Sequence, residues 1–226
     1  MQYQNVLSGR FLVRPNRFIA HVETAEGVQV CHVKNTGRCR ELLVPGATVY
    51  LEPGRTPGRR TAFDLIAVEK GDRLINMDAQ APNRVFEEWA RGGGFLPELS
   101  LLRPETTYRN SRFDFYWESS AERGFVEVKG VTLEEDGVVR FPDAPTLRGV
   151  KHLQELEEAR RAGYRTAVCF VIQMENVSWF EPNDRTHPAF GAALRHAAEA
   201  GVEVLAMECR VTPEELLPGR PVPVRL

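Results

Sequence analysis

The strongest constraint on the fold is a pair of alternating segments separated by a short polar stretch. The segments "RFDFYW" (112–117) and "GFVEVKGVTL" (124–133) alternate between polar and apolar residues, as β-strands with two different faces do. The stretch "ESSAERG" between them has no apolar run and ends in glycine, which is typical of a hairpin loop. The pattern therefore predicts an antiparallel hairpin that turns between Ser120 and Ala121.

The alternation sorts the side chains of each strand onto two faces. In the second strand, Phe125, Glu127 and Lys129 lie on one face, so that an acid and an amine are neighbours. In the first strand, three aromatic residues are expected on the face opposite Asp114: Phe113, Phe115 and Trp117.

The turn also sets the register of the hairpin. Asp114 and Glu127 are equally far from the turn, so folding the chain there places them directly opposite each other. Like charges in that position are destabilising, at a Cβ separation of roughly 4.5 to 5.5 Å, and a divalent cation such as Mg²⁺ would bridge them. Lys129 would then hold a water molecule or meet charge that develops on a phosphate. These residues predict a phosphodiester-hydrolysing site; the alternative is a solvated Glu-x-Lys face of an ordinary hairpin.

Length and composition describe an ordinary globular chain. The 226 residues are 42% hydrophobic and 27% charged, enough for one large domain or two small ones. The first residues have no basic segment followed by an apolar core, and no run reaches transmembrane length, so a cytoplasmic location is expected. The four cysteines form no C-x-x-C pair, which argues against a zinc site or a disulfide framework.

The charge is distributed unevenly along the chain. The net charge is −2, but residues 1–60 carry nine lysines and arginines against four glutamates. This balance of +5 leaves −7 for the remainder, which indicates two modules with a first module able to face a polyanion. A solvated arginine-rich surface would give the same count.

The first module, residues 1–80, is expected to be all β. Five short β-rich segments separated by turn residues fit a small closed barrel of the oligonucleotide-binding type. The barrel loop, residues 34–46, is its least regular part and offers four candidates for a nucleic-acid backbone: Lys34, Asn35, Arg38 and Arg40. A long polar connection is the alternative.

The second module, residues 81–226, mixes helices and strands. A helix with Asn83 as its N-cap precedes the hairpin, and a second helix follows it between Asp143 and Gly163. The order of elements predicts an α+β chain in which a mixed sheet is flanked by helices.

The helix after the hairpin carries further candidates. Its apolar stripe is predicted to contain Leu147, Val150, Leu153 and Leu156. Arg148, Lys151 and His152 lie near its start and, with the helix N-terminus, would attract phosphate. Asp143 is a candidate cap or an accessory acid of the metal site.

Four segments carry a resemblance to a known family: "NTGR", "SRFDF", "FVEVKGVTL" and above all "FPDAPTLRGVKHL". They resemble, in order along nearly the whole chain, the signature segments of the sugar fermentation stimulation protein family of bacteria and archaea. The resemblance implies an oligonucleotide-binding barrel followed by a domain similar to the PD-(D/E)XK nucleases. Members are described as DNA-binding proteins linked to the regulation of maltose metabolism.

The resemblance also implies roles for individual residues. Asp114 and Glu127 would be ligands of Mg²⁺ or Mn²⁺, Lys129 the catalytic lysine, and Glu98 a weaker fourth member in the helical acidic position. The usual "PD" is replaced here by Phe113-Asp114, which keeps the aspartate. The partner implied is DNA, and because phosphate contacts carry no direct sequence information, binding without sequence specificity is expected. A nuclease, a non-catalytic DNA-binding regulator and, more distantly, a sugar-phosphate enzyme remain open at this point.

Overall fold

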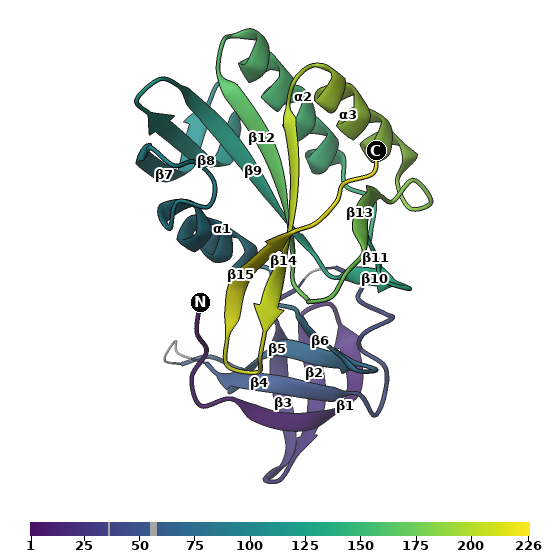
Figure 1. Ribbon diagram of the computed structural model, residues 1–226. Helices are drawn as coiled ribbons and strands as arrows, with labels where there is room; N and C mark the ends of the chain where they lie inside the picture. The colour runs from purple at the N-terminus through teal and green to yellow at the C-terminus, as the bar shows by residue number, and fades with distance from the viewer. Residues whose placement is uncertain (36, 55–57) are drawn as a thin grey trace.

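A computed structural model describes residues 1–35, 37–54 and 58–226 of the chain. Figure 1 shows a small β-barrel formed by the N-terminal part and, above it, a larger sheet covered by helices. The two expectations of fold, a barrel of the oligonucleotide-binding type and a mixed sheet flanked by helices, are both confirmed.

The described barrel sheet has six strands, in the order β3-β2-β1-β4-β5-β6. Their bounds are β1 (Leu7–Asn16), β2 (Ile19–Thr24), β3 (Gly27–Val33), β4 (Thr48–Pro53), β5 (Phe63–Lys70) and β6 (Arg73–Asn76). A parallel pairing between β3 and β5 closes the first five strands into a barrel, and β6 adds to the edge of β5. Inward side chains alternate with outward ones and fill the interior, among them Phe11, Val22 and Leu51.

The second domain is built on a six-stranded mixed sheet in the order β15-β14-β12-β9-β8-β7. The strands are β7 (Leu99–Tyr108), β8 (Ser111–Ser119), β9 (Arg123–Val131), β12 (Arg165–Ile172), β14 (Glu203–Val211) and β15 (Leu216–Pro221). Strand β12 is parallel to both of its neighbours, whereas the outer pairs are antiparallel. A smaller sheet of β10 (Leu133–Glu135), β11 (Val138–Phe141) and β13 (Trp179–Pro182) lies beside it (Figure 1).

Three described helices cover the two faces of the large sheet. Helix α1 (Ala81–Arg91) packs on the face that presents Phe115 and Val128. Helices α2 (Leu147–Arg161) and α3 (Pro188–Glu199) pack on the opposite face. No described helix is both long enough and apolar enough to span a membrane.

The hairpin has the register that the turn position predicts. Strands β8 and β9 pair from Glu118↔Arg123 to Phe115↔Val126, the pair directly adjacent to Asp114 and Glu127. The expected alternation of β8 is wrong at its start, because Phe113 packs with Phe125 whereas Phe115 packs on α1. Asp114 also points to α1, so the strand is irregular at this residue.

Both predicted helix caps are wrong. Helix α1 starts at Ala81, so Asn83 lies inside its first turn. Helix α2 is capped by Thr146, whose side chain accepts a hydrogen bond from the Gly149 amide at 3.0 Å. The buried stripe of α2 is also rotated from the predicted one, which leaves Leu147 80% exposed.

The two domains are joined by polar contacts between β5–β6 and the second domain. Lys70 Nζ lies 2.7 Å from Glu134 Oε2, and Gln173 Nε2 donates to Asn76 Oδ1 at 2.9 Å. The N-terminus reaches the hairpin β14–β15, where the Tyr3 amide donates to the carbonyl of Glu214 at 2.7 Å. These contacts fix the barrel against the sheet that carries the predicted site.

Candidate functional site

Asp114 is held between a helix and the neighbouring strand. Its Oδ1 accepts a hydrogen bond from the Asn83 amide of α1 at 3.0 Å, and its Oδ2 accepts one from the Val128 backbone N–H at 2.8 Å. Burial, the largest effect, and the charge of Glu127 raise the pKa of Asp114 above its ordinary value. The hydrogen bond from Val128, the residue after Glu127, anchors Asp114 to the part of β9 that carries Glu127.

Glu127 is 3% exposed and receives both of its hydrogen bonds on one oxygen. Its Oε1 accepts from Lys129 Nζ at 2.6 Å and contacts Nδ1 of His152. Burial acts to raise the pKa of Glu127, but the hydrogen bonds from His152 and Lys129 outweigh it and hold the pKa below its ordinary value. Glu127 Oε2 is buried without a hydrogen-bond partner among the described residues.

His152 belongs to this site and not to a nucleic-acid surface. The residue is 5% exposed, because the buried stripe of α2 carries it against β9. Arg148, one helical turn earlier, donates from Nε to His152 Nε2 at 3.3 Å. The prediction that His152 contacts nucleic acid directly is wrong, because the side chain is enclosed by the protein.

Two other predicted acids lie elsewhere. Glu98 is exposed in the turn before β7, not on a helix, and accepts a hydrogen bond from Ser120 Oγ at 2.6 Å. Ser120 is at the tip of the hairpin, six residues along the strand from Asp114, so Glu98 lies far from the carboxylate pair. Asp143 is not a helix cap: its Oδ2 accepts from the backbone N–H of Arg38 at 3.0 Å.

The barrel loop uses several of its polar groups for its own structure. Lys34 Nζ is paired with the buried Asp78 at 2.6 Å, and Asn35 Oδ1 accepts from the Gly37 N–H at 2.8 Å. Arg14 of β1 donates to four loop or turn carbonyls: those of Arg17, Asn35, Gly37 and Arg38. Thr36 lies outside the described residues.

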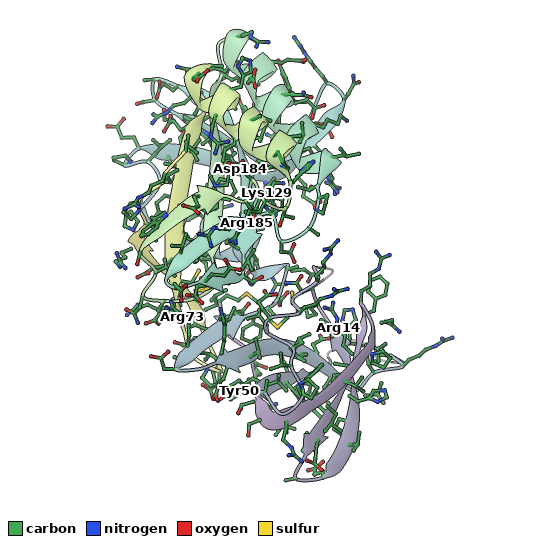
Figure 2. All side chains as sticks on the ribbon, turned by 90° about the vertical axis from the view of Figure 1, so that its right-hand side faces the viewer. Arg14, Tyr50, Arg73, Lys129, Asp184 and Arg185 are labelled. Atoms are coloured by element: carbon green, nitrogen blue, oxygen red, sulfur yellow. The ribbon has the colours of Figure 1, made fainter. Side chains whose placement is uncertain are left out.

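The remaining predicted cations are exposed. Arg38 and Arg40 of the barrel loop and Arg148 and Lys151 of α2 all present their side chains to solvent. The bond from the Arg38 amide to Asp143 brings the loop to the segment that leads into α2. A cavity of about 360 Å³ lies at this junction, with Gly37, Thr132 and Thr146 in its wall. Figure 2 shows Lys129 in the upper domain and Arg14 in the barrel below.

The donor set around Glu127 fits a hard cation held by few protein ligands. The described residues contain no group of three or more histidine, cysteine, aspartate or glutamate side chains arranged for a metal. Two adjacent carboxylates, one with an orphaned buried oxygen, suffice for an ion such as Mg²⁺, which keeps several waters and takes its other ligands from phosphate.

Comparison with known proteins identifies the family. Residues 12–77 match the family model described as the SfsA N-terminal OB domain, and residues 80–215 match the sugar fermentation stimulation protein RE domain. A sugar fermentation stimulation protein homolog of Desulfitobacterium hafniense is 56% identical over 226 residues, which covers 100% of this chain and 99% of that protein. The chain belongs to the sugar fermentation stimulation protein family.

Two further relatives extend this family assignment. The homolog of Clostridium beijerinckii is 54% identical over 216 residues, covering 96% of each chain. Among solved structures, the Pyrococcus furiosus SfsA in complex with Ca²⁺ is similar with a TM-score of 0.90 and 29% identity, covering 100% of this chain and 98% of that one. The similarity spans both domains and thus the whole described fold.

Sequence reasoning missed three residues that shape the site and its surroundings. Asn83 orients Asp114 instead of capping a helix, His152 holds Glu127, and Arg14 organises the barrel loop. Only His152 left a signal in the sequence, because Leu153 and Leu156 define a helical face that His152 also borders. The contacts of Asn83 and Arg14 depend on tertiary structure alone.

Proposed function

We propose that this chain is a nucleic-acid-binding protein whose second domain is built for metal-dependent phosphodiester hydrolysis. The observation that carries the proposal is the buried Glu127 Oε2, which has no hydrogen-bond partner among the described residues and lies in a carboxylate pair with Asp114. Buried polar atoms are nearly always satisfied, so an exception indicates an ion, a water or a function. Mg²⁺ or Mn²⁺ is the proposed cofactor.

The side chains divide the work. Asp114 and Glu127 would hold the cation, which when bound supplies positive charge and Lewis acidity to phosphodiester chemistry. Lys129, hydrogen-bonded to Glu127 and partly accessible, would donate a hydrogen bond to a phosphate oxygen or orient a water. Burial and the charge of Glu127 raise the pKa of Asp114, so a bound cation would offset the cost of ionising both carboxyl groups.

A relative supports the use of a divalent cation. The Pyrococcus furiosus SfsA, which shares the fold over the whole chain, is described in complex with Ca²⁺. Ca²⁺ and Mg²⁺ both prefer oxygen ligands, so a carboxylate site that serves one often accepts the other.

The nucleic acid is proposed to lie where the barrel loop meets the start of α2. Arg38 and Arg40 are exposed on the loop, and Arg148 and Lys151 are exposed on the first turns of α2. Such contacts hold the phosphate backbone and carry no direct sequence information. We therefore propose that the protein binds DNA without sequence specificity and that it does so in the cytoplasm. Lys34 and Asn35 act indirectly, because they shape the loop.

Incubation of the purified protein with labelled single- and double-stranded DNA, with Mn²⁺, with Mg²⁺ and with EDTA, tests the proposal. We expect cleavage products only with the metal, and their loss in Lys129→Met with little change in DNA affinity, because the lysine acts mainly in the transition state. The matched control is Arg210→Met, which removes an exposed cation of β14 outside the proposed contact set and should still cleave.

A non-catalytic DNA-binding regulator is the second candidate, favoured by the double occupation of Glu127 Oε1 by Lys129 and His152. Salt-sensitive DNA binding without products under any metal condition would support this candidate. Failure to bind long DNA at all would leave a small phosphate ester, as in a sugar-phosphate enzyme.

A further inference from the structure

The two oxygens of the Glu127 carboxylate are treated differently by the protein. Lys129 and His152 both contact Oε1, whereas Oε2 has no hydrogen-bond partner among the described residues. An exposed carboxylate could turn and exchange its two oxygens, but Glu127 is only 3% exposed and is packed within β9. The orientation of the Glu127 carboxylate is therefore set by the protein groups that contact it.

The tautomer of His152 follows from its two contacts. Arg148 donates from Nε to His152 Nε2 at 3.3 Å, and a guanidinium group has no acceptor. His152 Nε2 must then be the accepting nitrogen, so the neutral imidazole carries its proton on Nδ1. That N–H donates to Glu127 Oε1. Arg148 thus selects the form of the imidazole that can hold the glutamate.

Asp114 is also held by a donor from a helix, although both of its oxygens have hydrogen-bond partners. Asn83 of α1 donates an amide N–H to Asp114 Oδ1, as His152 of α2 donates to Glu127. Each carboxylate is therefore oriented by one N–H donor from a helix that packs on a different face. Donors on rigid, buried helices fix side-chain orientation more firmly than donors on loops.

We propose that His152 is a positioning residue of the carboxylate site, which holds Glu127 through Oε1 and so keeps Oε2 available to a divalent cation. This inference rests on the proposed cation site and adds the residue that prepares it. Groups that orient a metal ligand typically change metal affinity or activity 10- to 100-fold when they are removed.

Calorimetric titration of Mn²⁺ into three variants tests the role without any assay of cleavage. We expect His152→Leu to bind Mn²⁺ about 10- to 100-fold more weakly than the wild type. His152→Asn should restore most of the affinity, because the asparagine amide nitrogen occupies about the position of Nδ1 and can donate to Oε1. The control His196→Leu, at an exposed position on α3, should bind as the wild type does.

The outcomes distinguish failure of the positioning role of His152 from failure of the cation site itself. If the wild type binds Mn²⁺ and His152→Leu binds it equally well, the positioning role is overturned while the cation site stands. If the wild type binds neither Mn²⁺ nor Mg²⁺, the proposed function itself fails and the positioning role fails with it.

A second measurement needs no variant and so holds even if His152→Leu does not fold. In ¹⁵N NMR spectra of the imidazole groups of the wild type, His152 should carry its proton on Nδ1, with an unprotonated Nε2. A protonated Nε2 in the neutral ring, or rapid exchange between the tautomers as in a solvated histidine, would overturn the assignment.

Discussion

Two lysine–carboxylate pairs, one in each half of the molecule, have nearly the same geometry. Lys34 Nζ lies 2.6 Å from Asp78 Oδ2, and Lys129 Nζ lies 2.6 Å from Glu127 Oε1. Both lysine side chains are 16% exposed, and both carboxylates are buried. Distance and burial alone would assign the two pairs the same role.

The difference lies in the second oxygen of each carboxylate. Asp78 Oδ1 accepts a hydrogen bond from the backbone N–H of Gln80 at 2.9 Å, and Oδ2 also accepts one from the Tyr3 hydroxyl at 3.5 Å. Glu127 Oε2 has no such partner among the described residues. The saturated pair ties the barrel loop to the segment between β6 and α1, whereas the unsaturated pair has capacity left for a ligand. Hydrogen-bond saturation thus distinguishes these two lysine–carboxylate pairs and is the reason that we propose a function for the second.

The largest expected effect comes from removing each lysine in turn. Without metal, Lys34→Met and Lys129→Met should each destabilise the protein, by about 3 to 5 kcal/mol if the remaining charge stays buried. Mn²⁺ should recover stability in Lys129→Met beyond the increment of the wild type, because the cation replaces the lost ammonium. In Lys34→Met the increment should equal that of the wild type. Denaturant unfolding with and without Mn²⁺ measures both, and equal increments in the two variants would break the comparison.

The exposed cations of the barrel loop, Arg38 and Arg40, provide the next test, because among the described residues they are not held in an ion pair as Lys34 is. Arg38→Ala with Arg40→Ala should weaken binding to DNA of any sequence. The slope of log affinity against log salt should become shallower by about 1.8 on duplex DNA, about 0.9 for each lost phosphate contact. If the double variant keeps the wild-type slope, the barrel loop does not contact phosphate, and the DNA-binding face would lie around Arg148 and Lys151.

How much of this could be read from the sequence depends on the range of the contacts. The register of β8 and β9 as far as Phe115↔Val126 follows from local alternation and the position of a turn, so the sequence predicted it. The role of His152 required the rotation of α2 against the sheet, which a polar residue beside an apolar stripe does not specify. Glu98 was misplaced because the helical position that the resemblance implied is occupied here by a turn.

The same limit applies to the barrel loop. Its positive charge was evident, but the sequence could not show that Lys34 is neutralised by Asp78, 44 residues later. Nor could it show that Asp143 binds the backbone of Arg38 from another domain. Both contacts join distant segments and leave no periodic signal.

The third prediction concerns Asp143. Its side chain accepts a hydrogen bond from the Arg38 backbone N–H, so we expect a structural role like that of Asp78. Thr146→Ala should destabilise the protein by about 1 kcal/mol, since it removes the N-cap of α2. Asp143→Asn should change stability by less than about 0.5 kcal/mol, because an asparagine oxygen can still accept from the Arg38 amide. Thermal unfolding measures both. A loss of metal response in Asp143→Asn would make Asp143 an accessory acid after all.

The smallest expected effect is a gain in stability, whereas the variants described above lose stability or affinity. The folded-state pKa of Asp114 is raised, so its contribution to stability is present at low pH and is lost as pH rises through that pKa. At pH 7, Asp114→Asn should therefore increase the metal-free melting temperature, by no more than about 3 °C, the shift that about 1 kcal/mol gives in a chain of this size. The amide of Asn83 can turn over and accept from the new side chain, which preserves the contact. A lower melting temperature at pH 7 would mean that the charge of Asp114 stabilises the fold.

The most direct test of the account is a metal titration of the two carboxylates side by side. Mn²⁺ is titrated calorimetrically into the wild type, Glu127→Gln and Asp78→Asn, and melting is followed at the same metal concentrations. At 100 times Kd, the cation should stabilise the wild type by about 2.7 kcal/mol. Glu127→Gln should lose most of this binding and stabilisation, whereas Asp78→Asn should keep both although it is less stable. Undiminished Mn²⁺ binding by Glu127→Gln would contradict the claim that the unsaturated carboxylate is the cation site.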